Sequence, residues 1–417
     1  MAQSRIQERS TWARRSAAAV RPERLESRQL FAATVAGCPT VYPTIQAAVN
    51  AAPAGGTVHV AAGTYNELVT IAKPLTVLGA QAGVDARSPS RGCNESVVDG
   101  QAFGGGNSSS AFEFTANNVT IEGFTVQGQT SSNIYGAGIV LGPSIAGAHI
   151  IDDVVQDNVV GLYLSNDCAT DPAVIEHNLF AYNNNAGNNS GRGIYTDGGV
   201  SGGLLTNVLI DANTFVGNVG YGTNAPGGNP EAAIGLEAAG AGKQFNVTIT
   251  NNVMAKDGKA LLVYKATGVT FCGNLVTGST DTTSAAIRDE GNVVNMTVDN
   301  NTVLGGTGAA VLIDNKSTGG ASSGITVNGN NFAGNAGGGL AVVAGAYAGT
   351  LDARFNYWGS GSGQSVSAGV LFSCWSATPI AMPISFAIDN GPTVAVQAQQ
   401  TIASYACSLG SPILLMI

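Results

Sequence analysis

The residues of this chain best suited to chemistry are carboxylates at matching points of a repeated phrase. One copy of the phrase is VLIDANTFVGN at 208–218. The outward-pointing position of its first apolar run is acidic in four successive copies, and these residues are Glu122, Asp152, Glu176 and Asp211. Neighbouring strands would hold these carboxylates about 5 Å apart, where like charges repel unless they are neutralised or well solvated.

Two interpretations of this acidic file stay open. A hard cation such as Ca²⁺ accepts several carboxylate oxygens, so Asp152, Glu176 and Asp211 are the candidate calcium ligands and also the candidate catalytic residues. His177 directly follows Glu176 and is a further candidate ligand or base. The alternative is a solvated acidic stripe in which mutual repulsion raises the carboxyl pKa values slightly and His177 is structural.

A second set of residues favours sugar chemistry. Tyr163 and Tyr195 occupy the same outward position of a second apolar run in neighbouring copies, and two exposed rings in line would form a platform for sugar rings. Acidic residues follow this run in several copies, and paired carboxylates are what glycoside hydrolysis requires. The alternative is that these acidic residues cap turns. The predicted substrate-binding residues are Tyr163, Tyr195, Asp197, Glu237 and Arg288.

A repeat predicts the elements that position these residues. An Asn recurs in the pattern Φ-x-x-Asn-x-Φ at intervals of 22 to 39 residues, which is the spacing of a solenoid. The phrase alternates with period 2, as strands do, and no amphipathic helix fits between it and the second apolar run. Each coil therefore holds at least two short strands. The aligned asparagines are Asn178, Asn213, Asn252, Asn274, Asn301, Asn330 and Asn356.

This pattern predicts an all-β chain with a single-stranded right-handed parallel β-helix of about ten coils over residues ~55–362. The apolar positions of the phrase, such as Ile175, Ile210 and Ile249, are expected to stack inside. The repeated Asn is expected at the turn, because Asn tolerates left-handed backbone and can hydrogen-bond the Asn of the next coil.

The start and end of the repeat resemble a known family. PTIQAAVNAA at 43–52 predicts a short capping helix, and the first strands follow it within 55–80. This segment resembles the N-terminal cap and first coils of right-handed β-helix proteins, including pectin methylesterases and the carbohydrate-binding and sugar-hydrolase β-helix family with the pectin-lyase-like fold. FNYWGS at 355–360 resembles the closing repeat of that family. The resemblance covers 40–362 and implies the fold, with 363–417 as a C-terminal extension or cap.

The resemblance also bears on function. Pectate lyases of this fold bind Ca²⁺ on an outward acidic face, which implies the same for the acidic file. The reaction motifs of pectin methylesterases are absent, and of those of polygalacturonases only Asp152-Asp153 is present. We therefore expect a protein that binds or processes polysaccharide on its outer face, as a lyase or hydrolase if it is an enzyme. The alternative is a non-catalytic structural or adhesive cell-surface protein.

The net charge and the composition of the chain exclude some classes of binding partner. The net charge is −9, and an acidic surface argues against nucleic acid because phosphate binding needs a basic one. No run of 18 apolar residues is present, so no membrane span is expected. The partner is expected to be a polysaccharide or cell-surface glycan, and the protein a monomer. The six cysteines suggest either disulfides, with Cys38–Cys93 and Cys374–Cys407 as the suggested pairs, or six unpaired thiols.

The N-terminal segment suggests export. RPERLESRQLFA at 21–32 follows an Arg-rich lead and resembles a short N-terminal motif found on large exported proteins of planctomycete-type bacteria. The resemblance implies that residues 1–33 are a disordered basic sorting segment and that the protein is secreted or at the cell surface. The alternative is a basic tail without a sorting role.

Overall fold

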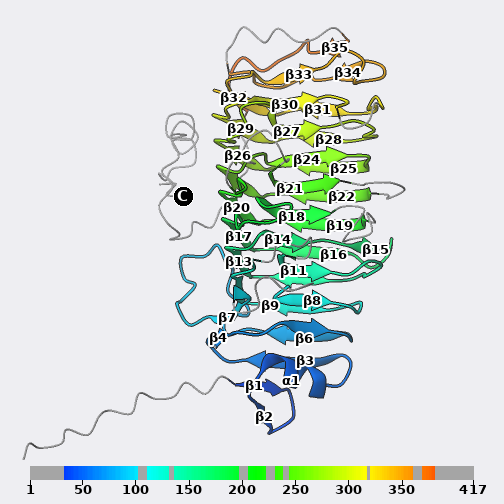
Figure 1. Ribbon diagram of the computed structural model, residues 1–417. Helices are drawn as coiled ribbons and strands as arrows, with labels where there is room; N and C mark the ends of the chain where they lie inside the picture. Colours follow the sequence, from blue (N-terminus) through cyan, green and yellow to red (C-terminus); the bar gives the residue numbers. More distant parts are fainter. Residues whose placement is uncertain are drawn as a thin grey trace, which may run out of the picture. The chain divides into compact units, whose positions relative to one another are not determined.

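The described part of the chain folds as a right-handed parallel β-helix (Figure 1). The computed structural model describes residues 32–101, 110–130, 136–196, 205–221, 231–237, 244–316, 320–359 and 369–380. The sorting motif at 21–32, apart from Ala32, lies outside these ranges, as do Asp197, Cys407 and most of the extension 363–417. No helix in the described ranges is long and apolar enough to cross a membrane.

Three sheets run along the solenoid. Sheet A holds β1 (Ala33–Val35), β2 (Val41–Tyr42), β3 (Gly56–Val60), β6 (Leu75–Leu78), β9 (Thr120–Glu122), β12 (His149–Ile151), β15 (Asn166–Asp167), β16 (Ala173–Glu176), β19 (Leu205–Asp211), β22 (Gln244–Thr250), β25 (Thr267–Cys272), β28 (Thr297–Asp299), β31 (Thr326–Asn328), β34 (Leu351–Asp352) and β35 (Val370–Leu371).

Sheet B holds β4 (Gly63–Tyr65), β7 (Ser96–Asp99), β10 (Phe124–Gln127), β13 (Val154–Gln156), β17 (Leu179–Ala181), β20 (Thr214–Val216), β23 (Val253–Ala255), β26 (Leu275–Thr277), β29 (Thr302–Leu304) and β32 (Asn331–Ala333). Sheet C holds β5 (Val69–Ile71), β8 (Phe112–Phe114), β11 (Ala137–Leu141), β14 (Val160–Tyr163), β18 (Arg192–Thr196), β21 (Ala232–Glu237), β24 (Leu261–Tyr264), β27 (Ala285–Asp289), β30 (Ala309–Ile313) and β33 (Leu340–Val342).

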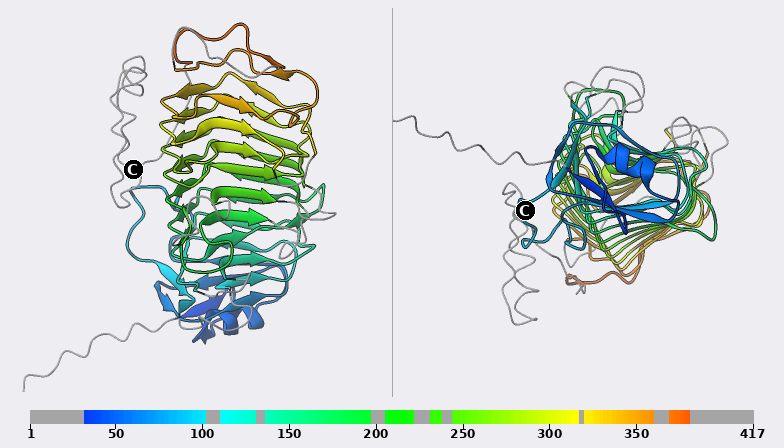
Figure 2. Two further views of the ribbon diagram at one scale, coloured as in Figure 1. Left: turned by 45° about the horizontal axis from the view of Figure 1, so that its top comes forward. Right: turned by 90° about the horizontal axis from the view of Figure 1, so that it is seen from below.

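Each coil contributes one strand to each sheet, which is one strand more than the minimum of two expected from sequence (Figure 2). The repeated phrase accounts for the difference, because it holds two strands. In VLIDANTFVGN the first strand, β19, ends at Asp211, the chain turns at Ala212 and Asn213, and β20 begins at Thr214. The turn is only two residues long, so the two strands appear in the sequence as one apolar pattern.

The inward file of sheet A forms the centre of the core. Ile175 pairs with Ile210, Ile210 with Ile249, and each of these side chains is fully buried. Burying one such side chain contributes about 1.5–3 kcal/mol, and the stack repeats this in every coil. The prediction of an inward file is confirmed, and its members from β9 to β31 are Ile121, Ile150, Ile175, Ile210, Ile249, Phe271, Val298 and Val327.

The repeated asparagines form a buried hydrogen-bonded ladder between sheets A and B. The Asn178 Nδ2 atom donates to Asn213 Oδ1 over 3.0 Å, and the Asn178 backbone N–H donates to the same oxygen. The pattern continues from coil to coil up to Asn356. The predicted ladder is confirmed, but left-handed backbone belongs to the residue before each Asn, as at His177 (φ 59°) and Ala212 (φ 53°).

A second ladder lies five residues further along, between sheets B and C. Asn158, Asn183 and Asn218 repeat the same amide-to-amide bonds, and Asn218 donates to Asp257 Oδ1 in the next coil. All four side chains are buried. The second Asn of the phrase VLIDANTFVGN, Asn218, is therefore structural like the first.

The N-terminal end is covered by the predicted capping helix, α1 (Ile45–Ala51). The Thr44 side chain accepts a hydrogen bond from the Ala47 N–H, and the Glu67 carboxylate accepts from the N–H groups of Ile45 and Gln46. The helix buries Ile45, Ala48 and Val49 against the first strands.

The predicted disulfide between Cys38 and Cys93 is wrong in this structure, where both residues are free thiols.

Candidate functional site

The strand pairing in sheet A differs from the predicted file of four carboxylates. Glu122 pairs with Ile151, Ile151 with Glu176, and Glu176 with Asp211. Asp152 lies one residue beyond the file, at the left-handed turn (φ 56°), and the four-carboxylate file is therefore wrong. The cause is that Asp153 occupies the ladder position in this coil, where its backbone N–H donates to Asn178 Oδ1, so the outward residue two positions before it is Ile151.

Two of the three remaining carboxylates of the file, Asp211 and Glu122, accept hydrogen bonds from neighbouring residues. Asp211 Oδ1 accepts from Thr250 Oγ1 over 2.7 Å and from Asn251 Nδ2 over 2.8 Å. Glu122 Oε1 accepts from the Gly83 N–H over 2.6 Å. No group of three or more His, Cys, Asp or Glu side chains is arranged to hold a metal ion within the described ranges, and calcium at Glu176 and Asp211 stays a prediction.

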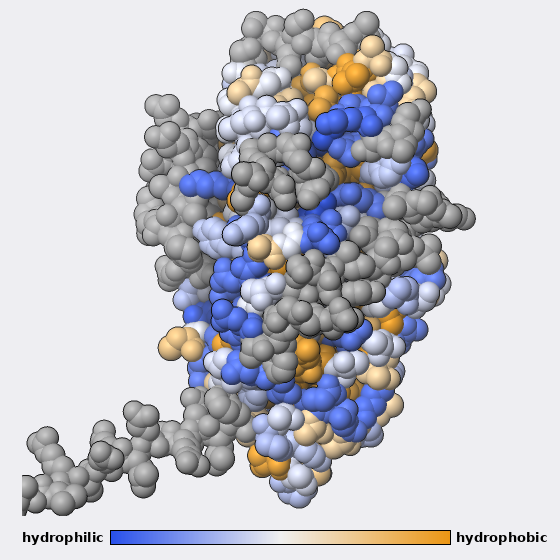
Figure 3. Space-filling model, viewed as in Figure 1, coloured by the Kyte–Doolittle hydropathy of each residue, from blue (hydrophilic) through white to orange (hydrophobic). Residues whose placement is uncertain are grey.

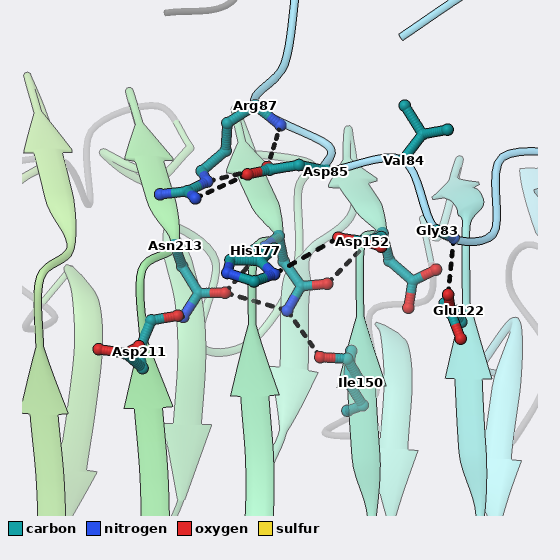
Figure 4. A network of polar contacts seen from close by, with 12 residues as sticks. Gly83, Val84, Asp85, Arg87, Glu122, Ile150, Asp152, His177, Asp211 and Asn213 are labelled. Carbon is teal, nitrogen blue, oxygen red and sulfur yellow. Dashed lines mark hydrogen bonds and ion pairs between the residues drawn. The ribbon is translucent and has the colours of Figure 1, made fainter. Parts of the chain in front are cut away.

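Asp152 instead belongs to a polar cluster at the turn after sheet A (Figure 4). His177 Nδ1 lies 3.7 Å from Asp152 Oδ1. The connection between β6 and β7, residues 79–95, crosses these coils: the Ala86 N–H donates to the His177 carbonyl, and Arg91 Nη1 donates to the Asp152 carbonyl over 2.6 Å. The Asp152 carboxyl and the His177 imidazole therefore lie close together, and the connection 79–95 is hydrogen-bonded to the backbone of both residues.

The two carboxyl groups of this cluster, Asp152 and Asp85, have pKa values shifted in opposite directions. Burial raises the pKa of Asp152 to about 6; His177 opposes this rise, while Asp85 and Glu122 add to it. Burial would also raise the pKa of Asp85, but hydrogen bonds from Arg87 outweigh it and hold that pKa below its usual range. Asp152 can thus give or take a proton near neutral pH while Asp85 stays ionised.

The outward file of sheet C has the register expected from sequence. Tyr163 pairs with Tyr195, and Tyr195 with Gly235. The expectation of two exposed rings is wrong, because Tyr163 is fully buried and Tyr195 is 5% exposed. Outward apolar side chains around them, such as Val140 and Val160, pack into a small cluster outside the main core. The Tyr163 hydroxyl also accepts a hydrogen bond from Asn189 Nδ2 over 3.0 Å.

Beside these tyrosines lies an arginine that sequence reasoning missed. Arg192 is 2% exposed, and its guanidinium carbon lies 4.1 Å from the Tyr195 ring centroid. Arg192 Nη2 lies 3.2 Å from Glu237 Oε1, and the Tyr195 hydroxyl donates to Glu237 Oε2 over 3.4 Å. The signal for Arg192 was its place at the start of the run RGIYT that carries Tyr195.

Two nitrogen atoms of the Arg192 guanidinium group, Nε and Nη1, are buried and make no hydrogen bond with any described residue. Gly235, which pairs with Tyr195 on the next strand, is itself buried. A Cβ atom at Gly235 would lie 3.2 Å from Tyr195 Cδ2, 3.6 Å from Glu237 Oε1 and 3.7 Å from Arg192 Nε, so these side chains pack closely over it. We call Arg192, Tyr195 and Glu237 the sheet C cluster.

Two groups of buried ion pairs continue along the same sheet. Lys259 pairs with Asp281. Arg288 pairs with Asp314 over 2.8 Å and with Glu290 over 2.6 Å, and its three nitrogens all contact these carboxylates. This engagement supports a structural role for Arg288, and its predicted contact with substrate stays a prediction.

The structure thus brings the predicted residues together in three places. Glu176 and Asp211 are neighbours on the outer face of sheet A, and Asp152 lies at the turn beside His177. Tyr163, Tyr195 and Glu237 meet on sheet C.

Comparison with known proteins finds similarity to solved structures. No protein-family profile and no curated protein sequence matches the chain. Among solved structures, the chain is similar to the catalytic unit of a GH87 α-1,3-glucanase from Streptomyces thermodiastaticus (TM-score 0.49, 16% identity, covering 80% of this chain and 66% of that one).

Two further structures are similar at the same level. One is a mannuronic-acid-specific polysaccharide family 6 lyase from human gut microbiota (TM-score 0.44, 14% identity, 76% and 77% covered). The other is a tailspike protein of E. coli bacteriophage HK620 in complex with a pentasaccharide (TM-score 0.45, 15% identity, 81% and 64% covered). The chain spans less than two thirds of the length of the glucanase unit and of the tailspike.

Proposed function

We propose that the protein binds polysaccharide on the outer face of sheet C, at Tyr195, Arg192 and Glu237. The observation that carries this proposal is the sheet C cluster, where an aromatic ring, a guanidinium and a carboxylate lie in contact and the Glu237 carboxylate is the most exposed of the three. Sugar sites commonly contain a few precisely placed polar groups, beside aromatic side chains, that fix the hydroxyls of the sugar. The tyrosine and the carboxylate were expected from sequence, and Arg192 completes the set.

The solenoid suits a long ligand. Each coil repeats the outer face at strand spacing, so a glycan chain that binds at the sheet C cluster can continue along neighbouring coils. If the protein also processes the glycan, Glu237 is the carboxylate placed to act as acid or base, because its side chain is 22% exposed.

A non-catalytic structural or adhesive protein is the second candidate. The observation in its favour is that Glu122 and Asp211, which a catalytic acidic face would need, are engaged in hydrogen bonds to Gly83, Thr250 and Asn251. Either role is compatible with export, which we propose from the motif at 21–32.

A glycan panel tests the proposed function. Neutral and acidic oligosaccharides would be titrated into the full chain by calorimetry, with Glu237→Ala as the site variant. The control is Arg354→Gln, whose side chain is 38% exposed and lies near the C-terminal end of the solenoid, several coils away from Glu237. We expect at least one glycan to bind, Glu237→Ala to weaken it about tenfold or more, and the control to leave it unchanged. A folded protein that binds no glycan in the panel contradicts the proposal.

A further inference from the structure

We propose that residues 381–417 dock on the exposed C-terminal end of the solenoid and close it, with TVAVQA at 393–398 lying beside β35. Residues 381–417 lie outside the described ranges, and both the surface that they would cover and their own sequence favour this docking. A stack of coils needs a cover at each end, because an end coil has no neighbour to bury its apolar side chains and its strand edge.

The N-terminal end shows how this solenoid closes an end. Helix α1 packs against the first strands, and its residue Gln46 satisfies the edge of β5, the first strand of sheet C. Gln46 Oε1 accepts from the Thr70 N–H over 2.7 Å, and Gln46 Nε2 donates to the Thr70 carbonyl over 3.1 Å. A segment of the chain itself therefore bonds the strand edge at this end.

The C-terminal end has no such cover in the described part of the chain. β35 is the last strand of sheet A, and no described strand pairs with its outer edge. Three large apolar side chains are exposed on the last two coils: Leu371 by 40%, Trp375 by 39% and Phe355 by 53%. The two coils are held together here, because Leu371 pairs with Asp352 and the Phe355 N–H donates to the Cys374 carbonyl. This end therefore presents apolar side chains next to a strand edge.

The chain leaves the described ranges at this same end. Asn331 opens β32, the last named strand of sheet B, and its side chain bonds both backbone groups of Ile380. Asn331 Oδ1 accepts from the Ile380 N–H over 2.7 Å, and Asn331 Nδ2 donates to the Ile380 carbonyl over 2.9 Å. Gln46 makes the same pair of bonds with Thr70 at the other end. Residues 381–417 therefore start from a point fixed at the C-terminal end.

The sequence of 381–417 suits an apolar surface. Asp389 is its only charged residue, so docking would bury almost no charge. Ile384, Phe386 and Ile388 alternate with small residues, which is the pattern of a strand with one buried face. Such a segment gains stability when its apolar face leaves water, and the exposed side chains of the last two coils gain in the same way.

The spacing of the coils selects TVAVQA as the strand beside β35. Ladder asparagines are 22 to 39 residues apart, so one further coil would place a strand of sheet A that far beyond Leu371, within 393–410. TVAVQA begins at 393, and its Val394 and Val396 alternate with other residues as in a strand. Pairing with β35 would bond the strand edge, and the rest of the segment would cover Phe355 and Trp375.

Limited proteolysis of the full chain tests the docking. Proteinase K cuts exposed chain and spares packed chain, and mass spectrometry locates the cuts. We expect 381–417 to stay intact in the wild type. Leu371→Asp should speed cleavage within this segment about tenfold or more, because a charge on the docking surface opposes burial. The control is Val41→Asp, at a side chain 61% exposed in β2 at the N-terminal end, and it should leave the rate unchanged.

A double-mutant cycle in the full chain separates docking from local damage. Leu371→Ser and the paired change Val394→Ser with Val396→Ser should each lower the melting temperature. If the two sites touch, the combined variant should lose less than the sum of the two losses. Combining the same valine changes with Val41→Ser is the control, where the losses should add. Leu371→Ser also replaces Leu371→Asp in the proteolysis if the aspartate variant does not fold.

Three results overturn the proposal. Equal cleavage rates within 381–417 in the wild type and in the folded Leu371 variant show that the segment does not pack on this end. Additive losses in the cycle show that TVAVQA does not contact Leu371. A full chain that is dimeric by light scattering, and that Leu371→Asp makes monomeric, assigns this end to a second copy of the chain.

Discussion

At the scale of single residues, the carboxyl groups of this protein differ because their surroundings differ. Burial raises the pKa of Asp152 to about 6 and the pKa of Asp257 and Asp289 to about 7. Hydrogen bonds and charge from Arg354 lower the pKa of the more exposed Asp352. Local sequence does not show this difference, because it depends on which strands and turns cover each carboxyl.

Stability should therefore fall as pH rises toward neutrality. The folded-state pKa values of Asp152, Asp257 and Asp289 lie above the ordinary value of 3.8, so the folded protein holds more protons than the unfolded chain between about pH 4 and 7. Their contribution is fully present below pH 4 and is lost through this window. Urea unfolding at about pH 5 and pH 7.5 measures the effect. A protein more stable at the higher pH would contradict it, and Asp152→Asn should flatten part of the slope.

Calcium is a second prediction at this scale. If Glu176 and Asp211, neighbours on sheet A, bind Ca²⁺, the ion should raise the melting temperature by mass action. Mg²⁺ should do less, because it holds its water and needs stricter geometry. Glu176→Gln, which keeps shape and loses charge, should weaken the effect. The measurement is a calcium titration of melting temperature in both proteins, and two unchanged curves would leave a solvated stripe.

At the scale of elements, the asparagine ladders join each coil to the next. Each ladder amide accepts from the coil before it and donates to a carbonyl in that same coil, as Asn252 does with the Asn213 N–H and the Ile210 carbonyl. The strands between the turns are as short as two or three residues, so the ladders fix where each strand ends.

Replacing one ladder residue should therefore be costly. Asn252→Leu keeps the volume but leaves buried groups of Asn213 and Ile210 without partners, at about 1–3 kcal/mol for each group. We expect a fall in melting temperature of several degrees or more. Asn94→Leu is the control, because the Asn94 side chain is exposed. Equal melting temperatures for the two variants would mean that the ladder adds little stability.

At the scale of the whole molecule, the sequence predicted the fold better than the site. Period-2 alternation and the recurring Asn placed Ile210 inside and Asn213 at the turn, since both patterns follow from stacking. The same reasoning misplaced Asp152, because one coil carries Asp153 at the ladder position. It also missed Arg192, and it treated the buried Tyr163 as exposed, because packing outside the core leaves no periodic signal.

A coil should be removable as a unit. Deleting 301–329 joins Asn300 to Asn330 and takes out β29, β30 and β31, so each sheet loses one strand and the ladder stays continuous. Arg288 loses Asp314 and keeps Glu290. We expect a folded protein with the circular-dichroism spectrum of the parent and a lower melting temperature. A chain that fails to fold after this deletion, while point variants of the same coil fold, would show that the coils are not interchangeable.

On the face shown in Figure 3, the described apolar residues lie in small separate groups among polar ones. In the sequence, the intervals between ladder asparagines vary from 22 to 39 residues while every sheet keeps its register. The extra residues fall between the strands in the sequence, and the pairing of those strands is unchanged. We therefore expect the solenoid to accept a foreign peptide inserted into one of its turns. Two such insertions in different coils would be separated along the solenoid by a whole number of strand spacings of about 4.8 Å each.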